Sequence, residues 1–258
     1  MAGDYDRLRP GPPEAALDWL VPPDCEIAVD LGAGTGLFTR ALERRARQVI
    51  AVEPDERMRA VLASRSPSVQ VVAGQGEAIP LPEGCVDGIF VSSAWHWLDP
   101  GAAVPEIARV LRDGGRLGVI WTSRDRRTDW LAGLDMFRGR ASRPAAGTGN
   151  AADVAHVQAG RGRRGHEVTL PEDAPFVNVA SASFTFTRSM TVDDAVDWLG
   201  TYSSVITAPE GEREAGLTVA RDALARRADE NGMVEIPMQS ACWRADRVRR
   251  SGAGATGE

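Results

Sequence analysis

The sequence contains no lysine, so all 30 of its strongly basic side chains are arginine, a bias that fits a GC-rich coding sequence. Cysteine is scarce: Cys25, Cys85 and Cys242 are widely spaced and form no CxxC or Cys/His pair. This indicates neither a disulfide framework nor a zinc site and predicts reduced thiols in the cytoplasm. Long apolar runs are missing as well, because those near 89–91 and 117–121 are only strand-sized. We therefore expect neither a signal peptide nor a membrane span.

The size and the charge of the chain narrow the class of protein. A chain of 258 residues, 43% hydrophobic and 26% charged, is typical of a globular protein and fits one elaborated α/β domain. The formal net charge of −6 disfavours a nonspecific nucleic-acid binder, since neutralising phosphates needs a concentrated basic surface. The expected partner is a small molecule, and the expected assembly is a monomer or a homodimer.

Short apolar runs alternate with helical spacing over the first half of the chain. Each run is bounded by turn or polar residues, which is typical of parallel βαβ units and favours an open, doubly wound sheet. Gly114-Gly115 is expected to stop the helix before the fifth strand. The strands are expected at 27–31, 49–52, 69–72, 88–91 and 116–121, with helices at 37–46, 55–63 and 105–111.

The second half is less regular. Residues 139–165 are rich in Gly, Ala and Arg, and we interpret them either as a long loop or lid or as a disordered insertion without function. Alternating Phe184 and Phe186 indicate that strand structure returns. The expected elements are a helix at 129–137, a strand at 183–187, helices from Thr191 and at 210–229, and two strands, 233–236 and 241–245, on either side of Pro237.

The segment VDLGAGTG at residues 29–36 places three glycines between a predicted strand and a predicted helix. Glycine lets the backbone approach a ligand closely and adopt positive φ. A dinucleotide fingerprint needs a glycine where Leu37 stands, so a nicotinamide cofactor is disfavoured. Asp30 suits a positively charged ligand, and Glu53, at the end of the next strand, can accept both ribose hydroxyl protons. Together these residues predict a mononucleoside site.

Combined with AVEPD at 51–55, this segment resembles the first two motifs of the class I S-adenosylmethionine-dependent methyltransferases. GQGEAIPLP at 74–82 resembles the family's third-strand segment, commonly GDAEALPF, in which a polar residue and an adjacent backbone amide recognise adenine. Gln75 and Gly76 replace the usual acid and alanine, and the Gln75 amide oxygen can still accept from the adenine amino group. The resemblance extends over residues 24–122, through VDGIFV of the fourth strand and EIARVLRDGG before the fifth.

The resemblance implies a fold, a methyl donor and a binding site. The implied fold is α/β and Rossmann-like: a doubly wound, mostly parallel seven-stranded sheet with helices on both faces and an inserted lid or loop after strand 5. The implied donor is S-adenosylmethionine, and its product is S-adenosylhomocysteine. The implied cofactor contacts are Asp30, Gly32, Ala33, Gly34, Glu53, Pro54, Gln75, Gly76, Glu77 and Ser92.

YDRLRP at 5–10 and SAWHWL at 93–98 resemble the trans-aconitate-methyltransferase-like and ubiquinone-methylase-like branch, in which the N-terminal segment folds over the cofactor. Tyr5 and Arg9 are therefore expected either to close the site, with Arg9 near the methionine carboxylate, or to anchor the segment to the surface. The implied organisation is a covering segment at 1–23, a cofactor-binding core at 24–122, a substrate-specificity insertion or lid at 123–182, the rest of the sheet at 183–250 and a tail at 251–258.

His96 follows the fourth predicted strand and either deprotonates a substrate hydroxyl or has a structural role, capping a helix or packing between indoles. Trp95 and Trp97 are expected to be substrate-binding walls or core residues. The sequence predicts in-line methyl transfer to a small molecule, in the tailoring of a secondary metabolite such as an antibiotic, and no motif identifies the acceptor. The alternatives are an S-adenosylmethionine-binding module without catalysis and a nicotinamide-dependent oxidoreductase.

Overall fold

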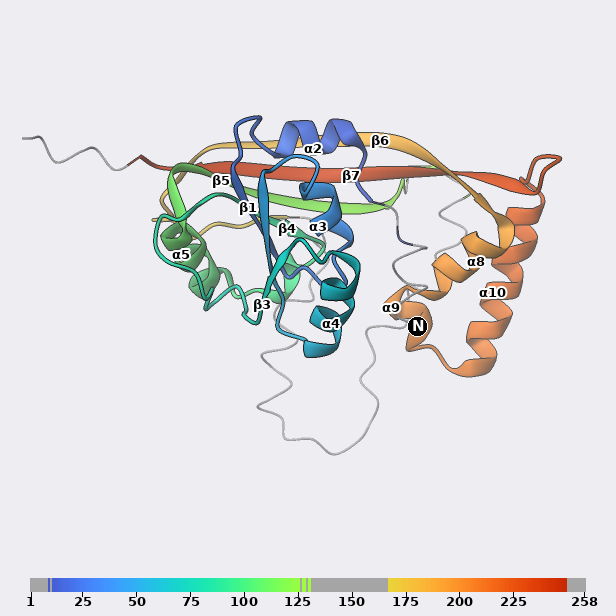
Figure 1. The fold of residues 1–258 in the computed structure, drawn as a ribbon. Coiled ribbons are helices and arrows are strands. Elements are labelled where there is room, and N and C mark those ends of the chain that lie inside the picture. The colour runs from blue at the N-terminus through green and yellow to red at the C-terminus, as the bar shows by residue number, and fades with distance from the viewer. Residues whose placement is uncertain (1–8, 10, 126, 129, 131–166, 250–258) are drawn as a thin grey trace, which may run out of the picture. The chain divides into compact units, whose positions relative to one another are not determined.

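The computed structural model describes residues 9, 11–125, 127–128, 130 and 167–249 (Figure 1). They divide between two compact units. The core unit falls within 11–121, 166–184 and 240–258, and the second unit falls within 1–10, 122–165 and 185–239. Each unit contains an apolar cluster of its own.

Seven strands form one sheet in the order β3-β2-β1-β4-β5-β7-β6. β1 pairs in parallel with β2 and with β4, β2 pairs in parallel with β3, and β4 with β5. The chain runs outward from β1 to β3 and then returns to β4 on the other side of β1, which makes the β1/β4 boundary a topological switch point, where open α/β sheets bind ligands. The strands are β1 Ile27–Leu31, β2 Gln48–Val52, β3 Gln70–Val72, β4 Val86–Ser92, β5 Leu111–Arg124, β6 Phe176–Thr191 and β7 Met233–Arg247.

Helices begin where the sequence offers a capping side chain. Asp55 accepts two backbone N–H groups at the start of α4, and Asp99, directly before Pro100, caps α5. Thr191 caps α8 by accepting from the Asp194 backbone. The helices are α2 Glu14–Leu20, α3 Leu37–Leu42, α4 Glu56–Arg65, the 3-10 helix η1 Trp95–Trp97, α5 Pro100–Val110, α8 Val192–Gly200, α9 Ser203–Ile206 and α10 Glu210–Ala225.

Helices cover both faces of the sheet in the core unit, as expected (Figure 1). Along β4, Ile89 and Val91 pack with residues of α5, whereas Phe90 between them packs with residues of α2 and α3. This alternation buries the strand on both faces, which is typical of parallel sheets.

The second unit is built around a separate apolar cluster. Trp198 of α8, Leu224 of α10 and Ile236 of β7 are buried in it. Among the described residues, no helix combines the length and the apolar character that crossing a bilayer requires.

The predicted strands of the first half are confirmed, but the turn before β5 differs from the prediction. α5 begins at Pro100 rather than at residue 105 and ends at Val110, and β5 starts at the next residue. The register between β4 and β5 shifts between Val86 and Gly88, and Gly114, with φ of +77°, lies in the part of β5 that bulges there. Gly114-Gly115 therefore forms an irregularity inside a strand and does not stop the helix.

The prediction of two short strands around Pro237 is wrong, since β7 runs unbroken from Met233 to Arg247. A proline removes only one N–H donor from a ladder, and the Pro237 carbonyl still accepts from the Asp125 backbone at 2.8 Å. β6 is also longer than predicted and includes residues 176–182 of the predicted insertion. The predicted loop 139–165, most of the predicted helix 129–137 and the tail 251–258 lie outside the described residues.

Candidate cofactor site

The glycine loop after β1 is tied to the end of β2. The backbone N–H groups of Gly32 and Ala33 donate to the Val52 carbonyl at 2.8 and 3.2 Å. The loop therefore turns into α3 at the carboxyl edge of the parallel strands, beside the switch point between β1 and β4.

Two glycines of this loop have different surroundings. Gly36 has φ of +85°, and a Cβ there would lie 2.8 Å from Leu62 Cγ, so conformation and space both require glycine. Gly34 has φ of +57°, but the nearest atom to a Cβ would be the Met58 sulfur at 3.8 Å. The backbone at Gly34 is thus open to the close approach of a ligand.

Glu53 follows β2 and holds the glycine loop against the start of α4. Its Oε2 accepts from the Gly34 backbone at 2.8 Å, and its Oε1 accepts from the Asp55 backbone at 2.9 Å. The Arg59 guanidinium donates to the backbone carbonyl of Glu53 at 2.9 Å. The residue is 7% exposed, and each carboxylate oxygen has a second lone pair that a ribose hydroxyl can use.

Asp30, the fourth residue of β1, is a fully buried carboxyl with one oxygen in use. The Thr39 hydroxyl donates to Oδ2 at 2.6 Å, and Oδ1 has no hydrogen-bond partner among the described residues. Burial raises the pKa of Asp30 to about 7, the bond from Thr39 opposes this, and the charge of Glu53 adds to it. A buried carboxylate oxygen requires a donor or a positive charge, so the residues present fit a cationic ligand group at this edge of the sheet.

Gln75 and Gly76 lie in a tight turn between β3 and β4. The Ala78 backbone donates to the Gln75 carbonyl at 3.1 Å, and Gln75 and Ala78 form an isolated antiparallel β-bridge. Gln75 is exposed, whereas Gly76 is buried against Leu98, whose Cδ2 would lie 2.6 Å from a Cβ at position 76. The Leu98 side chain therefore fills the space in which the family's usual alanine would place its methyl group.

Three other predicted contacts differ in their surroundings. The Glu77 carboxylate accepts from the Asp99 backbone at 2.8 Å, so its observed partner is the protein itself. Pro54 is exposed directly after Glu53, and Ser92 ends β4. Pro54 and Ser92 thus lie at the carboxyl edge of the sheet, where the prediction placed them, and their contact with a cofactor stays a prediction.

Trp95, His96 and Trp97 form η1, which is separated from the end of β4 by two residues. Trp95 is 4% exposed and belongs to the core cluster, the alternative that the sequence left open. The His96 imidazole lies beside the Trp97 indole, with ring centroids 4.8 Å apart, and Trp97 is 75% exposed. Partial burial lowers the pKa of His96, so the neutral imidazole, which can accept a proton, predominates at neutral pH.

Tyr5 and Arg9 are the two N-terminal residues predicted either to close the site or to anchor the segment. Tyr5 lies outside the described residues. Arg9 belongs to the second unit, where its guanidinium donates to the Thr201 carbonyl at 3.3 Å and lies 4.7 Å from the centroid of the Tyr202 ring. Arg124 approaches the same ring at 5.4 Å. These are anchoring contacts, and the contact of Arg9 with the methionine carboxylate stays a prediction.

Sequence reasoning missed three residues that shape the site. Thr39, buried in α3, holds the Asp30 carboxyl, and a hydroxyl among the inward apolar residues of that helix was the available signal. Glu106 and Arg109 of α5 bind the backbone of the segment that follows Gly76. Their signal was an acid and a base three residues apart on a helix.

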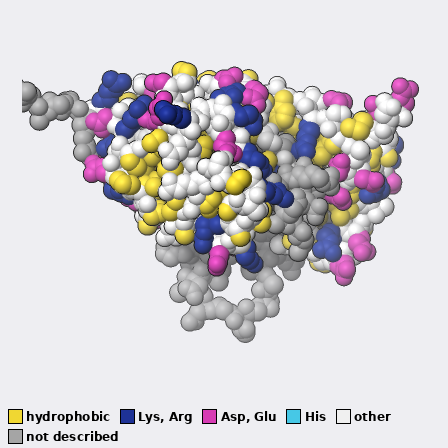
Figure 2. Space-filling model, in the orientation of Figure 1, with side chains coloured by type: hydrophobic (Ala, Val, Ile, Leu, Met, Phe, Trp, Pro, Cys, Tyr) yellow, Lys and Arg dark blue, Asp and Glu magenta, His cyan; other side chains and the backbone are white. Residues whose placement is uncertain are grey.

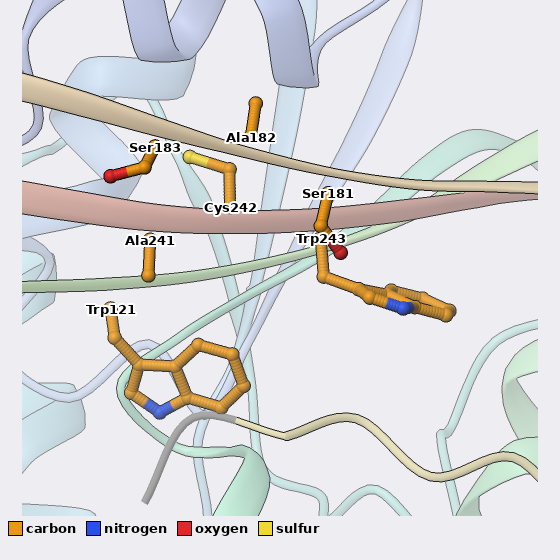
Figure 3. Close-up of a pocket in the computed structure, with 7 residues that line it drawn as sticks. All are labelled: Trp121, Ser181, Ala182, Ser183, Ala241, Cys242 and Trp243. Atoms are coloured by element: carbon orange, nitrogen blue, oxygen red, sulfur yellow. The ribbon is translucent and has the colours of Figure 1, made fainter.

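A separate pocket lies among β5, β6 and β7 of the core unit (Figure 3). The indoles of Trp121 and Trp243 lie on one side of these strands, and Cys242 points to the other. Burial raises the pKa of Cys242 to about 12, so it is a thiol at neutral pH. The pocket contains none of the predicted site residues; its lining is Trp121, Ser181, Ala182, Ser183, Ala241, Cys242 and Trp243.

A sheet of this strand order, with a glycine loop between two buried carboxylates at its switch point, defines a Rossmann-like nucleoside-binding protein. Residues 29–119 match the family model described as a methyltransferase domain. An uncharacterized methyltransferase of Mycobacterium tuberculosis is 38% identical over 94% of this chain and 92% of its own length. The chain belongs to the class I S-adenosylmethionine-dependent methyltransferases, and S-adenosylmethionine is its methyl donor.

Two further comparisons agree with this assignment. An uncharacterized methyltransferase-like protein of Schizosaccharomyces pombe is 31% identical over 82% of this chain and 79% of its own length. A solved structure from Anaeromyxobacter dehalogenans, provisionally named a Type II methyltransferase, has a TM-score of 0.64 at 23% identity and covers 94% of this chain and 99% of that one. The structural likeness establishes the shared fold.

Proposed function

We propose that this methyltransferase acts on a small molecule in the cytoplasm, in the tailoring of a secondary metabolite. The observation that carries the proposal is the distribution of charge. The net charge is −6, and on the face drawn in Figure 2 arginine and acidic side chains are interspersed. A nucleic-acid substrate would require a concentrated basic surface, so a small acceptor is favoured.

The residues at the carboxyl edge each bind a different part of the methyl donor. Glu53 accepts from the ribose hydroxyls, and Gln75 with the Gly76 backbone reads the adenine. The open backbone at Gly34 lets the nucleoside approach, and the Asp30 carboxylate compensates a positive charge of the donor. When bound, S-adenosylmethionine supplies a methyl group on a sulfonium, an electrophile with a good leaving group. The chain's own task is then to hold the acceptor in line and exclude water.

His96 is the proposed proton acceptor where the acceptor is a hydroxyl or an acidic carbon. It follows β4 at the carboxyl edge, and the lowered pKa keeps its imidazole neutral. Its neighbour Trp97 is the proposed contact for the acceptor, because this large apolar side chain is 75% exposed. An amine or carboxylate acceptor needs no such base.

Two measurements test the proposal. Titration calorimetry with S-adenosylhomocysteine should give one site, and NAD should give no heat of binding at the same concentration. A screen with isotopically labelled methyl donor should then find turnover on small acceptors and none on DNA or RNA. The screen should include carboxylic acids, because a malonyl-[acyl-carrier protein] O-methyltransferase of Methylococcus capsulatus is 38% identical over 109 residues, 40% of this chain. Methylation of nucleic acid alone would refute the small-molecule assignment.

A further inference from the structure

Two side chains of α5 bind the backbone of residues that follow the adenine-reading turn. The Glu106 Oε1 accepts from the Ile79 backbone at 2.8 Å, and Arg109 donates to the Ile79 carbonyl at 3.0 Å. Arg109 also donates to the Leu81 carbonyl at 3.0 Å. Both polar groups of the Ile79 backbone are thus satisfied by side chains of one helix, in a segment that has no regular secondary structure of its own.

Glu106 and Arg109 also bind each other, which makes the contact a rigid unit. The guanidinium donates through two nitrogens to the two carboxylate oxygens, each at 2.7 Å. The Arg109 side chain is 37% exposed and that of Glu106 is 18% exposed, so the pair is partly shielded from water. Arg109 holds the pKa of Glu106 below its usual range, so the carboxylate stays ionised at neutral pH. A bidentate pair of this kind fixes orientation as well as distance.

The turn that carries Gln75 and Gly76 is connected to this unit at short range. The Gln75 carbonyl binds the Ala78 backbone, and Ile79 is the next residue. Gly76 is closely packed against Leu98, so a shift of the segment would also require a shift of that side chain. A displacement of Ile79 would therefore move the backbone N–H of Gly76, on which recognition of adenine depends.

We propose that Glu106 and Arg109 are positioning residues for base selectivity: without touching the nucleoside, they set the place of the Gly76 backbone N–H through the Ile79 and Leu81 backbone. The proposal rests on the assignment of Gln75 and Gly76 to the adenine. Adenine presents an unprotonated ring nitrogen, N1, that can accept from a backbone N–H, whereas hypoxanthine carries a proton on N1. A Gln75 amide can rotate to suit either base, but a backbone N–H cannot, so discrimination depends on where the backbone is held.

The test compares the Kd values of S-adenosylhomocysteine and S-inosylhomocysteine, its analogue with hypoxanthine in place of adenine, by titration calorimetry. The wild type should prefer the adenine compound by at least about tenfold. In Arg109→Met the affinity for S-adenosylhomocysteine should fall, and the preference should fall several-fold toward unity. Arg109→Lys, which can reach only one carbonyl at a time, should give an intermediate preference, as should Glu106→Gln.

Arg45→Met is the matched control. The Arg45 side chain binds the carboxylates of Glu14 and Asp18 and is 23% exposed, and these partners lie outside the 74–82 segment. This variant should lose thermal stability and keep the wild-type preference. A merely structural role for Arg109 would produce the same pattern, whereas a positioning role changes the ratio of the two Kd values.

The outcomes separate the two proposals. If the wild type binds neither compound, the donor site itself is misassigned. If it binds both and Arg109→Met keeps the wild-type ratio, the positioning role is overturned while the donor site stands. Equal wild-type affinity for the two compounds overturns the positioning role as well. If Arg109→Met does not fold, Arg109→Lys and Glu106→Gln decide by the same ratio.

Discussion

Replacing Asp30 by asparagine should stabilise the fold and weaken donor binding at the same time. Asp30 is 0% exposed, and only one of its oxygens has a partner among the described residues, the Thr39 hydroxyl. Asparagine has nearly the same shape and keeps an oxygen for Thr39. It removes a buried negative charge, whose burial is costly without a counter-charge.

The size of the effect follows from the pKa of this carboxyl. Burial raises the pKa of Asp30 from 3.8 to about 7, with the charge of Glu53 adding to the rise and the bond from Thr39 opposing it. A pKa raised in the folded state means that the group's stabilising contribution is complete below pH 4 and is lost as the pH rises to 7. The ionised side chain then costs about 4 kcal/mol at pH 8. We expect Asp30→Asn to recover about 2 to 4 kcal/mol there and at most about 1 kcal/mol at pH 4.5.

Urea unfolding at pH 4.5 and pH 8 measures the gain in free energy of unfolding, and calorimetry at pH 8 measures the Kd of S-adenosylhomocysteine. That Kd should rise about 10-fold to 100-fold, the scale of a lost charged hydrogen bond. Asp55→Asn is the control, because the Asp55 carboxylate is paired with Arg57 and its pKa is lowered to about 2, so this variant should gain no stability at pH 8. An equal gain for Asp30→Asn at both pH values, or an unchanged Kd, would refute the reasoning.

Three other substitutions have defined outcomes. Glu53→Gln should weaken binding of S-adenosylhomocysteine by about 1 to 3 kcal/mol in calorimetry, because a neutral amide is a poorer acceptor for ribose hydroxyls; unchanged affinity would remove Glu53 from the site. His96→Ala should lower kcat and leave the Kd of S-adenosylhomocysteine unchanged, and loss of binding would instead assign His96 a structural role. In the wild type, the acid limb of the pH profile of kcat should lie below 6.5, because partial burial lowers the His96 pKa. Gly36→Ala should destabilise the fold by about 1 to 3 kcal/mol in urea unfolding, since φ is +85° and the methyl group would meet Leu62. Gly211→Ala in α10 is the control and should not destabilise the fold, because a Cβ there meets nothing within 4 Å.

The parts of the fold that the sequence predicted correctly have strong local signals. In the first half, apolar runs of strand length alternate with helices that begin at capping residues such as Asp55, and β1 to β5 follow from that pattern. β7 was predicted as two strands because Pro237 reads as a strand breaker. Its continuity depends on tertiary contacts, for example the bond from the backbone of Asp125, directly after β5, which no local pattern reveals. β6 was predicted too short because its first half contains small or polar residues such as Asn178 and Ser181.

The candidate site was predictable where chemistry depends on position along a strand. Asp30 is the last residue but one of β1, and Glu53 directly follows the neighbouring parallel strand β2, so their spacing alone places both at one edge of the sheet. Glu77 illustrates what the sequence does not reveal. It lies two residues after Gln75 in the same matched segment, yet its carboxylate accepts from the Asp99 backbone, a residue of a later turn. Tertiary contacts decide which residues of a motif contact the ligand and which bind other parts of the protein.

This division also bears on where acceptor specificity arises. Of the proposed donor contacts, Asp30, Glu53 and Gln75 belong to the core unit, whose apolar cluster is distinct from that of the second unit, whereas Arg9 belongs to the second unit. In the second unit, Trp198 and Leu224 are buried in that unit's own apolar cluster. Sequence can therefore vary in the second unit without disturbing the packing that holds Asp30, Glu53 and Gln75. A family that keeps one methyl donor and changes its acceptor would be expected to vary there. The specificity role of residues 123–182, a range that extends into the core unit, stays a prediction.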